Sequence, residues 1–443
     1  MRDAFIQKFS KAAHANGITN IEFYTKAVKS QSVGVYQGSV EEVEMSDITS
    51  CYIQGEYNGK TGAISVEDFS DEFIEEGIRY LQEAASISKS VVKWTERMSC
   101  DNRKEYEFTP IEKMSKKTVD VEEVVTKAYV GLQKFNGIHC GEKIREITIQ
   151  NDAGLCMRDN VKSASLWTQA ASEKDGIVQT ADKGYHAINV DDMDFYKLYL
   201  VAAMDACGMM DASPVPTGNY PIILKNDVLC EMLSMFIKAF GADEIRRKMS
   251  KLVGKVGEQI ASDIVNIIED PNLPEGINNR TFDDEGTPTQ AKQIIKDGKL
   301  QMYLYNCYEA EKAGGVALTG NGFKNYYKET VGISVTNLKL VGQDKTRDDL
   351  LEEMGDGLYI RHCDGMFAGA DVLTGDFTLI SRGYLVKNGK KDRGVNQITI
   401  AGNFFDMLKD IVAIGNDYMV NYTENGVYIA PSIYIKNLVV SGL

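Results

Sequence analysis

Hydrophobic periodicity along the first half of the chain predicts helices and strands in a regular order. Residues 2–15 carry apolar side chains at helical spacing and end at Asn16-Gly17, a usual stop signal. The segment 31–66, "QSVGVYQGSVEEVEMSDITSCYIQGEYNGKTGAISV", alternates β-forming and polar residues, which is typical of an antiparallel meander. A helix is then expected after Ser70, which can cap it, because one apolar stripe follows, namely Phe73, Ile74, Ile78 and Leu81.

The same order of elements recurs after a polar stretch at about 86–118. A helix is expected at 121–134, strands at 144–189 with a turn at "NDAG", and a helix at 192–206. This repetition predicts two similar subdomains inside an N-terminal domain of residues 1–212. The segment "DASPVPTGNY" at 211–220 places two prolines and a glycine between periodic segments, so we predict the domain boundary there.

Beyond Tyr220 the pattern favours short strands. One helical region is expected at about 226–265, with further helices at 347–354 and 403–412. The segments "IIKDGKL" and "LVKNGKK" place Asp-Gly or Asn-Gly between strand-forming residues, which predicts hairpins. We therefore expect an α+β fold whose second domain, residues 213–443, is β-rich.

Length, composition and net charge indicate the number of domains and argue against several classes of protein. A chain of 443 residues exceeds the roughly 250–300 at which one core stops growing, so two domains are expected. No window reaches the roughly 18 apolar residues of a membrane helix, and the first residues lack the apolar run of a signal peptide. We predict a cytoplasmic protein without membrane contact. The net charge of −15 argues against nucleic-acid binding, because the only compact basic run is at 245–251.

Cysteine and histidine usage gives no local metal motif. The eight cysteines are scattered singly without a C-x-x-C pair, and His14, His139, His186 and His362 are far apart in sequence. The pair His362–Cys363 in "RHCDG" suggests a nucleophile, yet neighbouring residues of a strand point to opposite faces. We therefore expect reduced cysteines and no Cys–His dyad here.

Several longer motifs carry a family resemblance. In the C-terminal half these are "FDDEGTPTQAKQIIKDGKLQMYLYN", "LLEEMGDGLYI", "LTGDFTLISRGYLVKNGK" and "ITIAGNFFDMLKDIVAIGND", and in the N-terminal half "VYQGSVEEVEMSD" and "ITIQNDAGL". With these motifs in this order, the chain resembles the TldD/PmbA family, once described as modulators of DNA gyrase. The resemblance runs the full length of the chain.

The resemblance implies a two-member peptidase system. TldD-type members carry H-E-x-x-x-H on a helix and a cysteine near the C-terminus, which together resemble a zinc site with a glutamate as general base. PmbA-type members, also called TldE, lack the motif and resemble partners that complete a heterodimeric peptide chamber. An ungapped alignment places the motif at "LSMFIK", so Leu233 and Lys238 stand at the histidine positions and Ser234 at the glutamate position. The C-terminal tail has no cysteine, so the chain is similar to the PmbA/TldE branch, and zinc is expected in the partner alone.

Two local features leave alternatives open. Asp283, Asp284, Glu285 and Gly286 of "TFDDEGTPTQ" are residues that turns select, and the alternative is a peptide cleft or a direct contact with substrate or metal. The following segment 291–300 is a hypothetical edge for an extended peptide. Lys238 is either a solvated lysine or a monovalent substitute for the partner's zinc. The glycine-rich segment 315–327 either lines a cleft or closes a turn.

We predict a non-catalytic subunit of a metallopeptidase complex, inactive alone, whose partners are a TldD-like zinc subunit and small or unfolded peptides. One alternative is a stand-alone homodimer that binds peptides without cleaving them. Another is an autonomous hydrolase in which the carboxylates of 283–285 hold Mg²⁺ or Ca²⁺.

Overall fold

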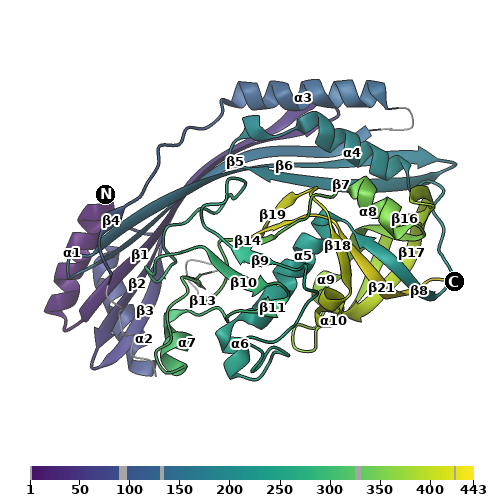
Figure 1. Ribbon diagram of the computed structural model, residues 1–443. Coiled ribbons are helices and arrows are strands. Elements are labelled where there is room, and N and C mark those ends of the chain that lie inside the picture. Colours follow the sequence, from purple (N-terminus) through teal and green to yellow (C-terminus); the bar gives the residue numbers. More distant parts are fainter. Residues whose placement is uncertain (1, 89–96, 130–133, 325–330, 424–425) are drawn as a thin grey trace.

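The computed structural model describes residues 2–88, 97–129, 134–324, 331–423 and 426–443 (Figure 1). Its N-terminal half is built on one large, long-stranded sheet. The helices and strands of that half are α1 (Arg2–Ala15), β1 (Thr19–Tyr36), β2 (Ser39–Tyr57), β3 (Lys60–Val66), α2 (Phe73–Ile87), β4 (Cys100–Asp101), α3 (Ile111–Ala128), β5 (Lys134–Asn151), β6 (Cys156–Lys174), β7 (Ile177–Ala187), the 3₁₀ turn η1 (Val190–Asp192) and α4 (Phe195–Cys207).

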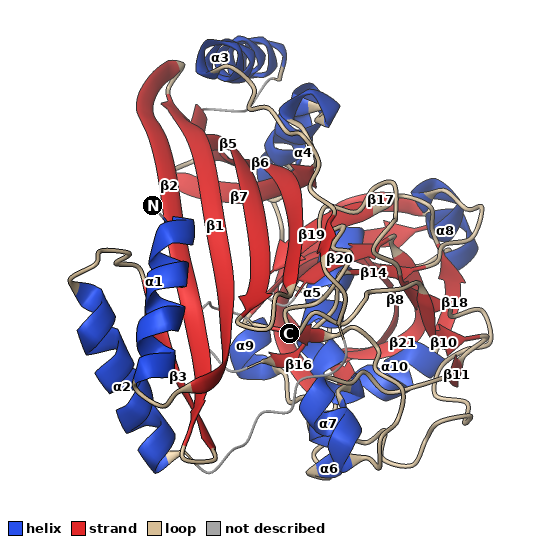
Figure 2. Ribbon diagram, turned by 90° about the vertical axis from the view of Figure 1, so that its left-hand side faces the viewer, coloured by secondary structure: helices blue, strands red, loops and turns tan. Residues whose placement is uncertain are grey.

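The predicted repetition is present in this sheet. The order helix, three-stranded meander, helix occurs as α1-β1-β2-β3-α2 and again as α3-β5-β6-β7-α4. The two copies join through antiparallel pairing of β1 with β5, in which Lys26 lies opposite Ile147. The strand order is therefore β3-β2-β1-β5-β6, with β4 and β7 both paired to β6. Figures 1 and 2 show α1 and α2 at one end of the sheet and α3 and α4 at the other.

Each copy of the repeat has its own apolar core. One core packs Phe5 and Phe9 of α1 against Phe23 and Ile53 of the sheet. The other packs residues of α3 and α4 against Phe135, Ile138 and Leu166. The opposite face of the sheet is left to receive the C-terminal half.

Several N-terminal boundaries differ from the predictions. The helix expected at 121–134 runs from Ile111 to Ala128, because its buried positions Met114, Thr118 and Val125 begin inside the stretch that looked polar. The first meander starts at Thr19 and not at 31, and the second ends at Ala187 after the expected turn at 151–154. Ser70 does not cap α2, whose N-cap residue is Glu72 and makes no side-chain capping bond.

The C-terminal half contains short helices and two larger sheets. Its elements are β8 (Gly218–Leu224), α5 (Asn226–Phe236), the 3₁₀ turn η2 (Ile237–Phe240), α6 (Ala242–Arg246), β9 (Ile267–Glu269), β10 (Lys292–Lys296), β11 (Lys299–Leu300), α7 (Cys307–Lys312), β12 (Gly322–Phe323), β13 (Gly332–Ile333), β14 (Asn337–Leu340), α8 (Arg347–Met354), β15 (Gly357–Asp364), α9 (Met366–Gly369), β16 (Asp376–Lys387), β17 (Lys390–Asn403), α10 (Phe404–Lys409), β18 (Ile411–Ile414), β19 (Met419–Thr423), β20 (Gly426–Ala430) and β21 (Ile433–Ser441).

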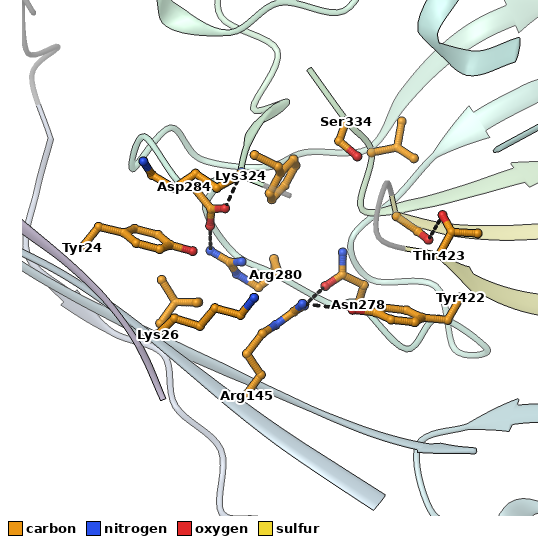
Figure 3. A pocket seen from close by; sticks show the side chains of 14 residues that line it. Tyr24, Lys26, Arg145, Asn278, Arg280, Asp284, Lys324, Ser334, Tyr422 and Thr423 are labelled. Atoms are coloured by element: carbon orange, nitrogen blue, oxygen red, sulfur yellow. Dashed lines mark hydrogen bonds and ion pairs between the residues drawn. The ribbon is translucent and has the colours of Figure 1, made fainter. Parts of the chain in front are cut away.

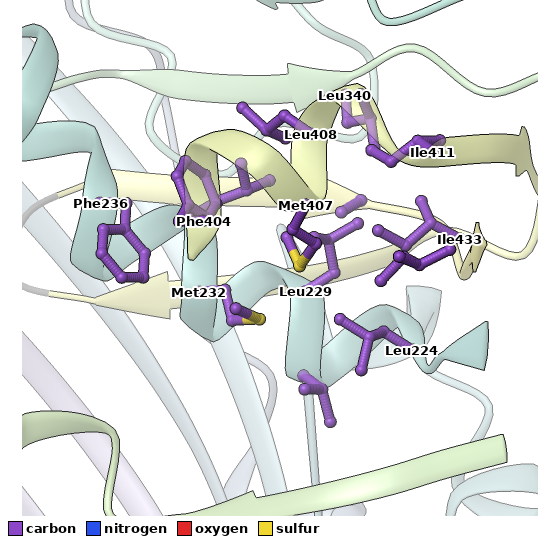
Figure 4. Packing of buried hydrophobic residues seen from close by; sticks show 14 of the residues in the cluster. Leu224, Leu229, Met232, Phe236, Leu340, Phe404, Met407, Leu408, Ile411 and Ile433 are labelled. Carbon is purple, nitrogen blue, oxygen red and sulfur yellow. The ribbon is translucent and has the colours of Figure 1, made fainter. Parts of the chain in front are cut away.

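One of the two sheets closes on itself. Its order is β17-β16-β15-β8-β21-β18, and β17 also pairs with β21, so five of its strands form a small barrel. The other sheet has the order β11-β10-β9-β14-β20-β19. Helix α5 and the short α10 fill the core, where the rings of Phe236 and Phe404 stack with centroids 4.4 Å apart (Figure 4). The expected α+β class with a β-rich second half is confirmed.

The hairpins and one helix of the C-terminal half match their predictions. Ile295 pairs with Leu300 and Lys387 with Lys390, so both expected hairpins form. Helix α8 spans the expected 347–354. The helical region expected at 226–265 is wrong beyond Arg246, because Lys248, Gly254 and Gly257 take positive φ angles that are incompatible with a continuing α-helix.

The expected helix 403–412 ends at Lys409, and the apolar run after it forms strand β18.

Buried charges connect the two halves. Asp205 of α4 is ion-paired with Lys183 of β7 at 3.2 Å and with Arg361 of β15 at 2.9 Å, and Lys183 also reaches Asp227 of α5 at 3.3 Å. These pairs hold the second repeat of the sheet against the barrel and α5. The boundary placed at 212–213 stays a prediction. Among the described residues, no helix is both long and apolar enough to cross a membrane.

Candidate functional site

The segment "TFDDEGTPTQ" forms a tight turn. Phe282 and Pro288 make an isolated antiparallel bridge, and the backbone N–H of Asp283 donates to the carbonyl of Thr287 at 2.8 Å. Gly286 has φ +79°, a left-handed conformation that glycine adopts without strain. Turn chemistry therefore accounts for the composition of the segment.

The three carboxylates of this turn accept backbone hydrogen bonds from other segments. Asp283 accepts from the N–H groups of Glu285, Thr287 and Gly322, at 2.8 to 2.9 Å. Asp284 accepts from the N–H of Lys324 at 2.8 Å, and Glu285 from the N–H of Cys307 at 2.7 Å. The turn thus ties together segments that are 22 to 40 residues apart in sequence.

The turn is covered by the N-terminal half. Burial, followed by the nearby carboxylate of Glu285, raises the pKa of Asp283 to about 8, although the backbone donors favour the ionised form. Arg97 donates to the carbonyl of Glu285 at 3.2 Å. A Cβ on Gly286 would lie 2.7 Å from Cδ of Arg97 and 3.1 Å from Sδ of Met157. A Gly286→Val change would consequently disturb packing. It is therefore unsuitable as a test of whether this turn binds a peptide, because lost packing and lost binding could not be separated.

We expect Asp283→Asn to lower the free energy of unfolding by about 1–3 kcal/mol, because the amide would place a donor against a backbone N–H that now donates. Chemical denaturation above pH 8, where the Asp283 carboxyl is ionised, measures this loss. Asp270→Asn is a suitable control, since among the described residues the Asp270 side chain accepts a hydrogen bond only from the local N–H of Asn272. Equal stability of the two variants would show that the Asp283 network contributes little.

The peptide edge expected at 291–300 is wrong for strand β10. β10 pairs with β9 along one side, where Lys292 lies opposite Glu269. Its other side pairs with β11, and the N–H of Gln301 donates to the carbonyl of Ile294. Both sides of β10 are therefore engaged in backbone pairing.

The three positions aligned with the zinc motif have unrelated environments. Leu233 is buried in the main core, and the Ser234 hydroxyl donates to the carbonyl of Glu231 at 2.8 Å. Lys238 lies exposed in η2, the geometry of a solvated lysine. Within the described ranges no three His, Cys, Asp or Glu residues gather as a metal would require. Leu233, Ser234 and Lys238 do not fit the zinc site of the family. The expectation that a partner subunit holds the zinc stays a prediction.

The strand carrying "RHCDG" separates its two reactive side chains. Nε2 of His362 lies 2.9 Å from Oδ1 of Asp364, whereas Sγ of Cys363 is buried and lies 3.4 Å from Oγ of Ser381. Burial raises the pKa of the Cys363 thiol to about 12. Cys363 is therefore placed as a structural thiol.

A polar cavity lies beside the turn, between the sheet and the C-terminal half (Figure 3). It holds about 30 Å³ of free space and is partly open to solvent. Tyr24 and Lys26 of β1 and Arg145 of β5 form one wall, while Arg280 and Asp284 form the other. The remaining walls come from residues 323–324, 334–335, 422–423 and 426. Of the residues expected to form a peptide cleft, Asp284 lines this cavity.

Cations outnumber anions around the cavity. The charged side chains that line it are Lys26, Arg145, Arg280, Lys324 and the single carboxylate Asp284. Arg280 donates to Asp284 at 3.0 Å, whereas Arg145 donates to two neutral groups, the Tyr422 hydroxyl at 3.2 Å and the Asn278 amide oxygen at 2.5 Å. In a chain with a net charge of −15, such a cluster is a candidate anion site.

Sequence reasoning missed most of these cavity residues. They come from six separate segments, and no local motif brings Lys26 near Arg145 or Arg280. The one available signal was the alternation of side chains along β1 and β5. Each strand places a cation on the face that also carries apolar residues such as Ile147. This signal could be used only if the pairing of β1 with β5 were already known.

Comparison with known proteins identifies the family. The sequence profile of the PmbA/TldA metallopeptidase C-terminal domain matches residues 217–442, slightly more than half of the chain. The chain belongs to the TldD/PmbA family. The resemblance stated from the sequence motifs is thereby confirmed.

The relatives of this TldD/PmbA member differ in how much of the chain they match. "Metalloprotease PmbA" of Escherichia coli O157:H7 is 34% identical over 45% of the chain and 42% of its own length. "Metalloprotease TldD homolog" of Haemophilus influenzae is 29% identical over 48% of the chain and 44% of its own length. The chain thus spans somewhat less than half the length of these curated relatives.

Solved structures match the whole fold. A Thermotoga maritima protein described as a candidate modulator of a DNA gyrase has a TM-score of 0.88 at 26% identity and covers 100% of both chains. TldE of Thermococcus kodakarensis has a TM-score of 0.85 at 17% identity, covering 99% of this chain and 100% of that one. The second likeness concerns the fold alone.

Proposed function

We propose that this TldD/PmbA chain is a subunit without zinc in a metallopeptidase complex, and that it helps to hold peptides while a TldD-type partner carries the metal. One observation carries the proposal. The family fold is present along the whole chain, yet the three positions aligned with the zinc motif are a core leucine, a serine bonded to its own helix and an exposed lysine.

An exposed apolar surface on the barrel supports a partner. Phe367 of α9 is 95% exposed and Ile380 of β16 is 60% exposed. Ile380 pairs with Asp364, directly before α9, so the two side chains belong to one region. Neighbouring exposed apolar side chains mark candidate protein contact surfaces. We assign this region, which we call the Phe367 surface, to partner docking.

The test combines this chain with a purified relative that carries the H-E-x-x-x-H helix. We expect an unfolded peptide to be cleaved by the mixture and not by this chain alone, with zinc found only in the relative by metal analysis. Phe367→Glu should weaken association roughly tenfold or more, because a central aromatic contact is replaced by a charge. Analytical ultracentrifugation of the mixture measures association.

Met45→Glu is the matched control, since Met45 is 70% exposed on β2 of the N-terminal sheet, away from α9. Chelator-sensitive cleavage by this chain alone would contradict the proposal and indicate a metal site of its own. Peptide binding by a homodimer that ignores the relative would favour a stand-alone binding protein.

A further inference from the structure

We propose that the cavity between β1, β5 and the turn at 281–290 binds a carboxylate group of a peptide, either its C-terminus or an acidic side chain. This inference rests on the proposed peptide-holding function and names the chemistry that the chain would recognise. It is carried by three cationic side chains, Lys26, Arg145 and Arg280, which converge on the cavity in Figure 3.

Two of these cations have no acidic partner. Among the described residues, no carboxylate oxygen lies within ion-pair distance of Lys26 or Arg145, while other lysines and arginines of the chain form many such pairs. The Lys26 ammonium also makes no hydrogen bond to a described residue, although its side chain is half-buried. A cation held away from bulk water without a counter-charge is costly, and a bound anion would remove that cost.

The geometry leaves donors available for an anion. A guanidinium has five N–H donors, and Arg145 uses one each on Tyr422 and Asn278. Its Nε is buried and makes no hydrogen bond. Nε of Arg280 also makes no hydrogen bond, but it lies 3.7 Å from Oδ2 of Asp159. The Arg280 side chain is almost fully buried and faces both Asp284 and the cavity. Fixed donors with unused capacity are the form that carboxylate recognition takes in proteins.

Asp284 does not neutralise the cluster. Its Oδ1 accepts from Arg280 and its Oδ2 from the backbone N–H of Lys324, so both oxygens are occupied. The resulting excess of positive charge is visible in neighbouring groups. Arg145 lowers the pKa of the Tyr422 hydroxyl, and burial followed by Arg145 lowers the pKa of the Lys26 ammonium.

The size and place of the cavity favour a carboxylate on a chain. About 30 Å³ of free space suits a small planar group better than a whole residue. The cavity is partly open, so the rest of a peptide can extend outwards from it. The carboxylate would lie between Lys26 and Arg145, with its two oxygens facing one cation each.

The experiment measures direct binding of three versions of one short peptide to the full chain by titration calorimetry. The versions have a free C-terminal carboxylate, a C-terminal amide, or a C-terminal amide together with one internal glutamate. We expect the first or the third to bind roughly tenfold tighter than the plain amide, since a charge-assisted hydrogen bond has an effect of that size. The pattern identifies which source of carboxylate the cavity takes.

Lys26→Met should remove this preference while keeping the apolar stem of the side chain, and Lys26→Arg should restore it. The matched control is Lys29→Gln on the same strand, because Lys29 is exposed and paired with the exposed Asp47 at 3.6 Å. Arg145→Met provides a second variant, with thermal unfolding to verify that it folds.

Equal affinity for all three peptides, or no binding of any, would overturn the carboxylate site. So would a preference that survives Lys26→Met and Arg145→Met. Tight binding of inorganic phosphate that leaves peptide affinity unchanged would also overturn it. A failure of this inference is distinguishable from a failure of the proposed function, because cleavage by the mixture with a zinc-carrying relative does not require a carboxylate preference.

Discussion

Asp205→Ala is expected to lower the free energy of unfolding by about 3–5 kcal/mol, measured by chemical denaturation at neutral pH. Asp205 is the buried anion between Lys183 and Arg361, and it joins α4 of the sheet half to β15 of the barrel. Its removal leaves Arg361, which is 2% exposed, with no acidic partner among the described residues. Lys183 would retain Asp227 at 3.3 Å.

The same substitution should change the response to acid. Burial opposes ionisation of Asp205, but Lys183 and Arg361 outweigh it and lower its pKa below the ordinary aspartate value. A lowered pKa in the folded state gives stability that is present above the unfolded pKa of about 3.9 and is lost as pH falls through the folded pKa. The unmodified protein should therefore lose more stability than Asp205→Ala on acidification below about pH 4.

Asp211→Ala is the matched control for both measurements. Asp211 lies just after α4 and pairs with Lys174 at 2.8 Å, but its side chain is 80% exposed. An exposed pair of this kind contributes less than about 1 kcal/mol. If Asp205→Ala were no more destabilising than Asp211→Ala, the buried charges would not be holding the two halves together.

The architecture could be predicted from sequence wherever local pattern determines the element. The helix, meander, helix repetition was visible because antiparallel hairpins and amphipathic helices are local, and both Asp-Gly and Asn-Gly hairpins formed. Predictions were wrong where apolar spacing allowed two structures. The run after Lys409 fits a helical stripe, but pairing with β21 makes it a strand.

The candidate site could be predicted only in part. "FDDEG" identified a turn beside the cavity, because the turn residues are consecutive. The cations that make the cavity an anion site are far apart in sequence, and Lys26 and Arg145 come together through pairing of β1 with β5. The same limit applies to Glu269, which drew no attention in the sequence, because its partners lie 23 to 67 residues away.

Glu269→Ala is expected to lower the free energy of unfolding by at least about 3–5 kcal/mol, because the carboxylate is fully buried and is paired with the buried ammonium of Lys292. Oε1 accepts from the N–H and hydroxyl of Thr336 at 2.7 and 3.0 Å. Oε2 accepts from Lys292 at 2.9 Å and from the Asn321 amide at 2.8 Å. One side chain thus connects β9 to β10, to Thr336 just before β14 and to Asn321 just before β12. The turn at 281–290 contacts the next residue, Gly322.

The loss of stability in Glu269→Ala should come mainly from Lys292, which would be left buried without a counter-charge. The Lys292 side chain is 3% exposed and Glu269 is its only ion-pair partner among the described residues. The double variant Glu269→Ala/Lys292→Met should therefore lose less stability than the sum of Glu269→Ala and Lys292→Met. Glu258→Ala, which breaks the exposed Lys255 pair at 2.6 Å, should change stability by less than about 1 kcal/mol. Additive losses in the double variant would instead assign the effect to the hydrogen bonds of Thr336 and Asn321.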